Sequence, residues 1–203
     1  MKLLIFTRYP EAGSVKTRLI PTLGADGARN LHRKMAEHTI KRLDCLTAEM
    51  EVCFTGRGEK EMQEWLGKKR SYSPQGGGDL GQRLLKAFAQ AFCQGEDKVV
   101  VVGTDCPDLT AAHVQEAFHL LDEFDLVLGP AADGGYYLLG LNRLYKDLFE
   151  SIPWGTGEVL QATLNKAKLL GINTVLLERL ADVDRPKDLE ALFKRTFKLL
   201  KRL

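Results

Sequence analysis

"KVVVVGTDCPDL", residues 98–109, decides the fold. Its four successive valines make an apolar, β-branched run, and a glycine and two aspartates follow directly. A run that is apolar on both faces is typical of a strand in a parallel sheet that helices cover on two sides. Ligands of such sheets bind beyond the carboxyl ends of the strands. Asp105, just after the run, is therefore a candidate functional residue, whereas a place at the start of the next helix is the favoured explanation of Asp108.

The same alternation of strand and helix continues along the chain. Further apolar runs of strand length lie at residues 3–6, 52–54, 126–128, 136–139 and 175–177. Between them, apolar side chains recur at helical spacing in residues 25–47, in residues 80–93 and in the segment that begins at Thr110. This pattern predicts an α/β fold with a largely parallel sheet.

The composition is that of an ordinary globular domain. A chain of 203 residues can bury roughly 70% of its unfolded surface, so residues 1–203 are expected to form a single domain without metal or disulfide support. The net charge of +2 indicates no nucleic-acid partner, and no apolar run approaches the length of a transmembrane span. The four cysteines lie far apart and form no CxxC pair, which favours reduced thiols in a cytoplasmic protein.

The segment after the first predicted strand, "EAGSVKTRLI" at residues 11–20, is basic and contains a glycine. Gly13 permits a tight turn and close backbone approach to a ligand, while Lys16 and Arg18 can pair with phosphate oxygens. The glycine spacing of a Walker loop or of a dinucleotide-binding loop is absent. The residues alone leave two interpretations open, a basic surface loop and a loop that holds phosphate.

A second acidic segment is "DVDRPKDLEAL", residues 182–192. Asp188, in the first turn of a helix that starts at Pro186, is explained by ordinary helix stabilisation. Asp182 and Asp184, which lie on the same side of an extended stretch, are not explained in this way. Mg²⁺ usually takes one or two carboxylates and completes its shell with phosphate and water. Asp184 opposite Asp105 would supply such a site.

Two glycine-containing segments offer contacts to a second substrate, "GPAADGGYYLLGL" at residues 129–141 and "PWGTGEVLQATL" at residues 153–164. The turn Asp133-Gly134-Gly135 suits either a hairpin connection or close approach to a ligand. Trp154 either stacks on that ligand or closes the core beneath a loop.

Two other segments have structural explanations. "SPQGGGDLG", residues 73–81, leads straight into a helical segment and is interpreted as a loop within the domain. "LFKRTFKLLKRL", residues 192–203, is basic and amphipathic, and a docked terminal helix is favoured over a membrane-binding or calmodulin-binding segment.

In their order, these segments resemble a known superfamily, the nucleotide-diphospho-sugar transferases of the GT-A fold. The resemblance rests on "FTRYPEAGSVKTRL", "QGGGDLGQRL", "GTDCPDL", "GPAADGGYYLLGL", "WGTGEVLQATL" and "DVDRPKDL", and so covers nearly the whole chain. The chain is most similar to small bacterial glycosyltransferase-like proteins. The opening motif also resembles nucleotidyltransferases, including guanylyltransferases that act on phospholactate and molybdopterin. The resemblance implies a Rossmann-like, three-layer α/β/α sandwich in which a mostly parallel central sheet contains an antiparallel strand.

The resemblance also implies roles for individual residues. The nucleotide phosphates would contact Gly13, Lys16 and Arg18, and the loop beside the base or ribose would contain Gln75, Gly78 and Asp79. Asp105 and Asp184 would bind Mg²⁺ or Mn²⁺. The acceptor would face Asp133, Gly134, Gly135, Tyr136 and Trp154. One departure is the D-x-x-D spacing of Asp105 and Asp108, because typical glycosyltransferases of this fold carry D-x-D.

Three functions are compatible with these features. The leading hypothesis is a Mg²⁺-dependent transferase that passes a sugar from a nucleotide-sugar to an unknown acceptor. In it, Lys16 and Arg18 stabilise the leaving phosphates and Asp133 is the general base. The alternative is nucleotidyl transfer, in which a phosphorylated acceptor attacks a nucleoside triphosphate and pyrophosphate leaves. A third hypothesis is a non-catalytic nucleotide-binding protein. We expect small-molecule ligands, neither nucleic acid nor membrane as a partner, and leave a homodimer open.

Overall fold

The computed structural model describes residues 1–200, and side chains as far as residue 194. Its strands are β1 Lys2–Arg8, β2 Glu49–Thr55, β3 Ser71–Pro74, β4 Val99–Gly103, β5 Leu126–Pro130, β6 Tyr136–Leu141 and β7 Thr174–Leu176. Its helices are α1 Ile20–Leu43, α2 Glu59–Leu66, α3 Leu80–Cys93, α4 Ala111–Leu120, α5 Val159–Leu169 and α6 Pro186–Leu200. Two short 3-10 helices, η1 Thr17–Leu19 and η2 Lys146–Phe149, lie in connections.

The seven strands form one sheet in the order β3-β2-β1-β4-β6-β5-β7. Pairing is parallel between β1 and β2, β1 and β4, β2 and β3, and β5 and β7. Only β6 runs against its neighbours, β4 and β5. The predicted mostly parallel sheet with an antiparallel strand is therefore confirmed.

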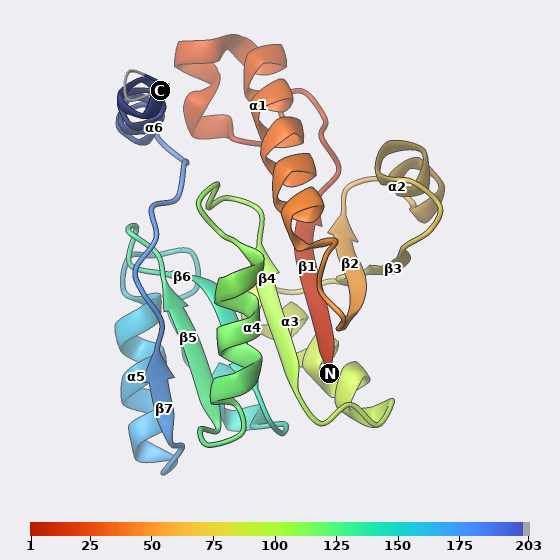
Figure 1. Ribbon diagram of the computed structural model, residues 1–203, viewed down its shortest axis with the longest axis vertical. Helices are drawn as coiled ribbons and strands as arrows, with labels where there is room; N and C mark the ends of the chain where they lie inside the picture. Colours follow the sequence, from red (N-terminus) through yellow and green to blue (C-terminus); the bar gives the residue numbers. More distant parts are fainter. Residues whose placement is uncertain (201–203) are drawn as a thin grey trace.

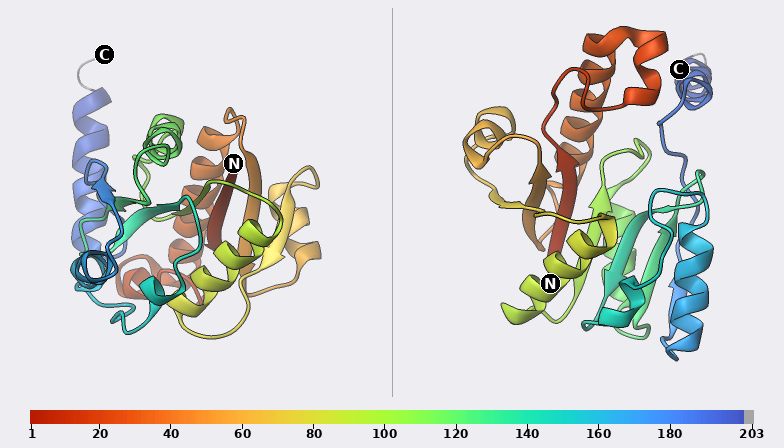
Figure 2. Two further views of the ribbon diagram at one scale, coloured as in Figure 1. Left: turned by 90° about the horizontal axis from the view of Figure 1, so that it is seen from below. Right: turned by 180° about the vertical axis from the view of Figure 1, so that it is seen from behind.

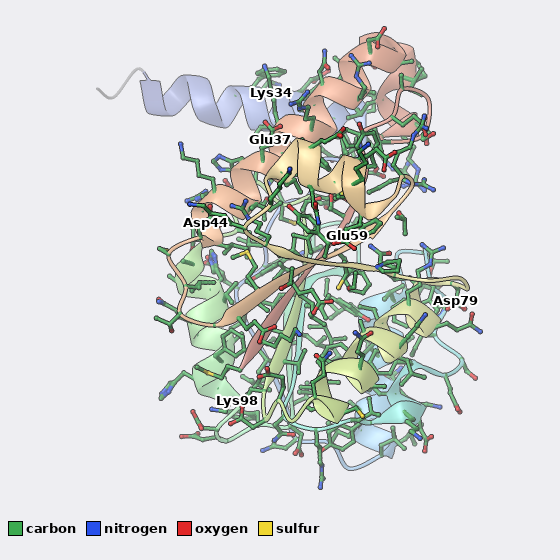
Figure 3. The ribbon with its side chains drawn as sticks, turned by 90° about the vertical axis from the view of Figure 1, so that its right-hand side faces the viewer. Lys34, Glu37, Asp44, Glu59, Asp79 and Lys98 are labelled. Carbon is green, nitrogen blue, oxygen red and sulfur yellow. The ribbon has the colours of Figure 1, made fainter. Side chains whose placement is uncertain are left out.

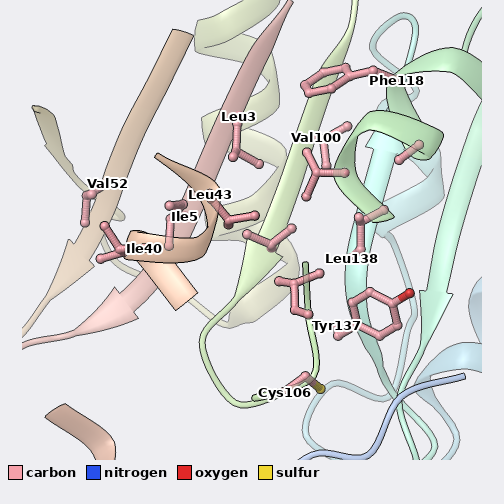
Figure 4. Packing of buried hydrophobic residues seen from close by; sticks show 14 of the residues in the cluster. Leu3, Ile5, Ile40, Leu43, Val52, Val100, Cys106, Phe118, Tyr137 and Leu138 are labelled. Carbon is pink, nitrogen blue, oxygen red and sulfur yellow. The ribbon is translucent and has the colours of Figure 1, made fainter. Parts of the chain in front are cut away.

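Helices cover both faces of the sheet because side chains alternate along each strand. Leu3, Ile5 and Val100 point to one face, where α1, α2 and α4 pack, and Figure 4 shows this cluster from close by. Leu4 and Val99 point to the other face, which α3 and α5 cover. Figure 1 shows α4 in front of the sheet, and the right-hand view of Figure 2 shows α3 and α5 on the opposite side. The three predicted layers are thus confirmed.

Some boundaries differ from the prediction. The strand β3 and the helix α2 were not predicted, because "SYSP" lacks an apolar run and α2 is only eight residues long. The helix predicted over residues 25–47 ends at Leu43 and starts at Ile20, with a kink at Gly24, whose φ is 70°.

The terminal helix docks as predicted at its start. Leu189 of α6 packs with Met35 of α1 and with the fully buried Val183. The basic side chains predicted beyond residue 194 lie outside the described residues. Among the residues that the structure describes, no helix is long and apolar enough to cross a membrane.

The carboxyl ends of β1, β2, β4, β5 and β7 meet at one edge of the sheet, the upper edge in Figure 1. The loops that leave this edge are the segments singled out from the sequence. The segment after β7, residues 177–185, passes along the same edge before α6 begins, and we call it the strap.

Candidate functional site

The site is centred on the carboxyl ends of β1 and β4. In the order β3-β2-β1-β4, the connections of the chain reverse direction beside β1, and such a switch point forms the ligand crevice of doubly wound sheets. The two strand ends are joined by a hydrogen bond of 3.3 Å between the hydroxyls of Thr7 and Thr104. The loops after β1 and β4 therefore start from two strand ends that are hydrogen-bonded to each other.

The segment after β1 that contains residues 11–20, which we call the opening loop, turns sharply. Gly13 has a φ of 82°, as a tight turn requires, and Lys16 has a φ of 47°, which is uncommon for a residue with a side chain. The loop is held from below, since Arg8 Nη1 donates to the carbonyl oxygen of Ser14 and His32 Nε2 donates to that of Arg8. These contacts fix where Lys16 emerges.

Lys16 is buried and makes two short contacts. Its Nζ lies 2.7 Å from Asp105 Oδ1, after β4, and donates to the carbonyl oxygen of Val183 at 2.6 Å. The backbone N–H of Val183 also donates to the carbonyl oxygen of Asp105 at 2.9 Å. Lys16 thus ties the opening loop to the β4 loop and to the strap.

A second ion pair lies beside the first. Arg18 Nη1 donates to Asp184 Oδ2 of the strap, and this hydrogen bond raises the pKa of the guanidinium. The negative charge of Asp133, in the loop after β5, also raises the pKa of Arg18. The loop after β5 therefore lies near this ion pair. Each predicted phosphate-binding cation is therefore paired with one predicted metal-binding carboxylate.

A cavity of about 710 Å³ opens beside these ion pairs. Among the predicted site residues, it is lined by Arg18, Asp105, Asp133, Gly135, Tyr136, Trp154 and Asp184. Its size falls within the usual range of small-molecule sites. Gly13, Lys16 and Gly134 are not among its lining residues, so the fold brings part of each predicted set into one concave site.

Four of the five residues predicted to face the acceptor, Asp133, Gly135, Tyr136 and Trp154, line the cavity. Asp133 Oδ1 accepts the N–H of Gly135, which shapes the turn after β5. The rings of Tyr136 and Trp154 meet edge to face, with centroids 6.4 Å apart. A Cβ on Gly81 would lie 2.2 Å from Trp154 Nε1, so a glycine in the first turn of α3 makes room for the indole.

The cavity is also lined by carboxylates from the strap and from the start of α6. Asp182 of the strap lines it, and burial raises the pKa of that carboxyl, with a further contribution from the nearby charge of Asp133. Asp188 also lines the cavity, and its Oδ2 accepts the N–H of Arg185 at 2.8 Å. The helix-start role predicted for Asp188 is therefore confirmed.

The residues predicted beside the base or ribose lie apart from the cavity. Gln75 is buried, and its Nε2 donates to the carbonyl oxygens of Thr7 and Cys53. Asp79 is the N-cap of α3 and forms a capping box with Gln82, with Gly78 just before it at a φ of 96°. Figure 3 shows Asp79 at the N-terminal end of α3. These contacts are structural, and a nucleotide-binding role for the three residues stays a prediction.

A divalent cation held by Asp105 and Asp184 stays a prediction. Asp105 and Asp184 are hard oxygen donors on adjacent segments, and both line the cavity. Within the described part of the chain, no group of three or more His, Cys, Asp and Glu is arranged to hold a metal. Magnesium sites that are completed by phosphate and water need no such group.

The structure adds residues that the sequence did not single out as ligand contacts. Leu80, Arg185 and Lys187 line the cavity. Arg185 directly follows Asp184 and Lys187 lies two residues further along, so their place beside a predicted metal ligand was the available signal. His32, which supports the opening loop, sits in a helical pattern like any core residue and gave no signal.

These features define the class. The chain has the fold of nucleotide-diphospho-sugar transferases and nucleotidyltransferases. A candidate nucleotide-diphospho-sugar transferase from Desulfovibrio desulfuricans is 36% identical, with a TM-score of 0.91 over 96% of this chain and 86% of that chain. A nucleotidyl transferase from Methanothermobacter is 17% identical and shares the fold, with a TM-score of 0.62 over 98% of this chain and 99% of that chain.

Residues 39–156 match the model of a family described as "Uncharacterized protein conserved in bacteria (DUF2064)", and the chain belongs to this family. A curated relative, the 2-phospho-L-lactate guanylyltransferase of Methanocaldococcus jannaschii, is 27% identical over 197 residues. The match spans 95% of this chain and 83% of the relative. The chain is an enzyme of the transferase type and is nucleotidyltransferase-like. The curated guanylyltransferase favours nucleotidyl transfer over glycosyl transfer, which reverses the ranking expected from the sequence.

Proposed function

We propose that the protein transfers a nucleotidyl group from a nucleoside triphosphate to a phosphorylated small molecule and releases pyrophosphate. The observation that carries the proposal is the rim formed by Lys16–Asp105 and Arg18–Asp184, which borders a cavity large enough for a second substrate. The guanylyltransferase relative supports it, because the similarity spans nearly the whole chain.

In this proposal the opening loop binds the triphosphate. The guanidinium of Arg18 is exposed and matches phosphate oxygens in planar, bidentate geometry. Lys16 adds a positive charge at the base of the loop, close to the carboxylate of Asp105. Fixed positive groups of this kind stabilise the negative charge that develops on a leaving pyrophosphate.

Asp105 and Asp184 would hold a divalent cation such as Mg²⁺. When bound, the cation would offset the charge of the phosphates, as metal ions do in phosphoryl transfer. The backbone N–H of Val183, the neighbour of Asp184, donates to the carbonyl oxygen of Asp105, which supports a shared role for the two segments.

The acceptor would enter the cavity between Trp154 and Asp133. One oxygen of its phosphate attacks the α-phosphorus of the triphosphate and forms a new P–O bond. The bond from the α-phosphorus to the oxygen that bridges to the β-phosphate breaks, and its electron pair leaves with pyrophosphate. An ionised phosphate needs no general base, so the role of Asp133 would be to orient the acceptor.

Glycosyl transfer is the second candidate function. It is favoured by the 36% identity to the candidate nucleotide-diphospho-sugar transferase, which exceeds the identity to the guanylyltransferase. In this reaction an acceptor hydroxyl attacks the sugar, a nucleoside diphosphate leaves, and Asp133 would accept the proton of the hydroxyl.

The product released distinguishes the two reactions. The enzyme is incubated with Mg²⁺ and either each nucleoside triphosphate plus phosphorylated acids such as 2-phospho-L-lactate, or nucleotide-sugars plus hydroxyl acceptors. We expect pyrophosphate from the first mixture, a loss of roughly 100-fold or more in Arg18→Gln, and near-normal rates in Asp122→Asn, whose residue pairs with Lys98 before β4. Release of nucleoside diphosphate without pyrophosphate, lost in Asp133→Asn, would contradict the proposal and establish the second candidate.

A further inference from the structure

Among the described residues, three cations line the cavity, and they differ in their partners. Arg18 is paired with Asp184 at the rim. Arg185 and Lys187, on either side of Pro186 at the start of α6, are exposed. Among the side chains that the structure describes, neither of these two cations has a carboxylate partner. Their positive charges are therefore available to a ligand.

The acidic lining of the cavity sets a requirement for any anionic acceptor. Five carboxylates line the cavity, those of Asp105, Asp133, Asp182, Asp184 and Asp188. An anion that enters meets more negative than positive lining groups, and like charges repel appreciably wherever water is partly excluded. Such an acceptor therefore needs positive groups of its own inside the cavity.

The other two cations of the site are already assigned. In both candidate reactions Lys16 and Arg18 contact the phosphates of the nucleotide. Lys16 is also held by Asp105 and by the carbonyl oxygen of Val183, and it does not line the cavity. The lining cations that remain for the second substrate are those at the start of α6.

We infer that Arg185 and Lys187 form an anion subsite that binds a phosphate or carboxylate group of the acceptor. The enzyme then selects anionic acceptors over neutral ones, and these two side chains determine that specificity. The inference rests on the proposed function, which assigns Lys16 and Arg18 to the nucleotide, and deepens it by giving the charge of the acceptor and the residues that recognise it.

The backbone beneath the subsite is held in place. Asp188 Oδ2 accepts the N–H of Asp184 at 3.3 Å and that of Arg185 at 2.8 Å. Leu189, one residue further along, packs with the fully buried Val183 of the strap. The first turn of α6 is thus fixed to the strap, and the Asp188 carboxylate is occupied by backbone donors.

The two side chains offer different contacts. The planar guanidinium of Arg185 can bind two oxygens of one phosphate or carboxylate, whereas the ammonium of Lys187 acts as a point charge. We therefore expect Arg185 to contribute more to the recognition of the anion than Lys187.

Isothermal titration calorimetry tests the inference without a measurement of turnover. The probes are inorganic phosphate, phosphoglycolate, which carries a phosphate and a carboxylate, and neutral glycerol, all in EDTA so that no metal ion recruits the anion. We expect the wild type to bind the two anions and not glycerol. Arg185→Gln should weaken the binding of phosphoglycolate about tenfold, the scale of a hydrogen bond to a charged group. Arg185→Lys should keep most of the affinity because it keeps the charge, and Arg185→Gln combined with Lys187→Gln should lose more than either change alone.

Lys194→Gln is the matched control. It removes one positive charge from the same helix, at an exposed position that does not line the cavity. We expect it to bind every probe as the wild type does. The affinity for nucleoside triphosphate with Mg²⁺ should stay the same in Arg185→Gln, because the opening loop binds the triphosphate. Since Arg185 and Lys187 are exposed, we expect unchanged unfolding temperatures in their variants.

Equal affinity for phosphoglycolate in the wild type and in the double variant would overturn the inference, as would an equal loss in Lys194→Gln. An equal loss of triphosphate binding would also overturn it, because the two cations would then belong to the nucleotide phosphates. A wild type that binds neither anion would overturn it as well.

The failure of the proposed function is distinguishable, since it appears as absence of pyrophosphate in the product assay. An enzyme that releases nucleoside diphosphate and still needs Arg185 to bind the anions would keep the subsite and lose the proposed function. Pyrophosphate release with unchanged anion binding in the double variant would leave the function standing and remove the inference alone.

Discussion

Lys16 stands out at the scale of single residues. Apart from glycines, only Lys16 and Ser151 have a positive φ within the described part of the chain. Such backbone strain persists where surrounding contacts hold the residue, and it is frequent at functional sites. The side chain of Lys16 supplies those contacts through Asp105 and Val183. The sequence predicted Lys16 as a phosphate ligand and could not reveal that it also holds two other loops in place.

His32 is a second residue that supports the opening loop, and we predict that it contributes to the pH dependence of stability. It is buried on α1 and donates to the carbonyl oxygen of Arg8 at 2.8 Å. Burial lowers the pKa of its imidazole below the ordinary 6.5, so the folded protein holds it neutral. Below about pH 6.5 the His32 imidazole becomes protonated in the unfolded chain at a higher pH than in the folded chain.

The stabilising contribution of neutral His32 is therefore complete above pH 6.5 and declines as the pH falls from there toward the folded-state pKa. The contribution of this one group changes by at most about 1.4 kcal/mol per pH unit. We predict that His32→Gln flattens the dependence of the unfolding free energy on pH between 7 and 5, measured by urea denaturation. An unchanged slope in His32→Gln would contradict this account.

At the scale of elements, the start of α3 shapes the acceptor wall. Asp79 and Gln82 cap the helix, and Gly81 leaves space in which the indole of Trp154 rests. The indole in turn meets the ring of Tyr136. The capped start of α3 thereby positions Trp154, the largest aromatic side chain of the cavity.

Gly81→Ala is predicted to displace Trp154, because its new Cβ would overlap the indole. We expect a loss of about 1–3 kcal/mol in unfolding free energy, as for other overpacked sites, and a raised KM for the acceptor. Gly77→Ala is the matched control, since nothing lies within 4 Å of its Cβ position. Wild-type stability and an unchanged acceptor KM in Gly81→Ala would show that Trp154 does not depend on the glycine.

The elements also show what the sequence could predict. Apolar strands such as β4 and helices with a clear apolar stripe such as α3 were predicted correctly. Their pattern is readable because one face or both faces are buried. The polar strand β3 was missed, because its backbone pairing with β2 gives it a place that its side chains do not indicate. The site loops were predicted from strand ends, but the cation–carboxylate pairs were not. They depend on how closely the strap passes the opening loop, which no local pattern encodes.

At the scale of the whole molecule, sheet topology assembles the site. The neighbouring strands β1 and β4 deliver Lys16 and Asp105, although 89 positions separate them in the sequence. The strap then crosses the same edge on its way to α6 and adds Asp184. Phosphate-binding and metal-binding groups thus come from three distant segments, and the cavity beside them remains available for an acceptor.

The most direct test of the central claim is a thermal-shift measurement with each nucleoside triphosphate, in Mg²⁺ and in EDTA. It compares the wild type with Asp184→Asn and with a control, Asp122→Asn, because Asp122 pairs with Lys98 and does not line the cavity. A ligand at 100 times its Kd adds about 2.7 kcal/mol, or roughly 5–10 °C for a chain of this size. We expect a shift that needs Mg²⁺, persists in Asp122→Asn and is lost in Asp184→Asn. A shift that is equal in EDTA and in Asp184→Asn, or no shift with any triphosphate, would contradict it.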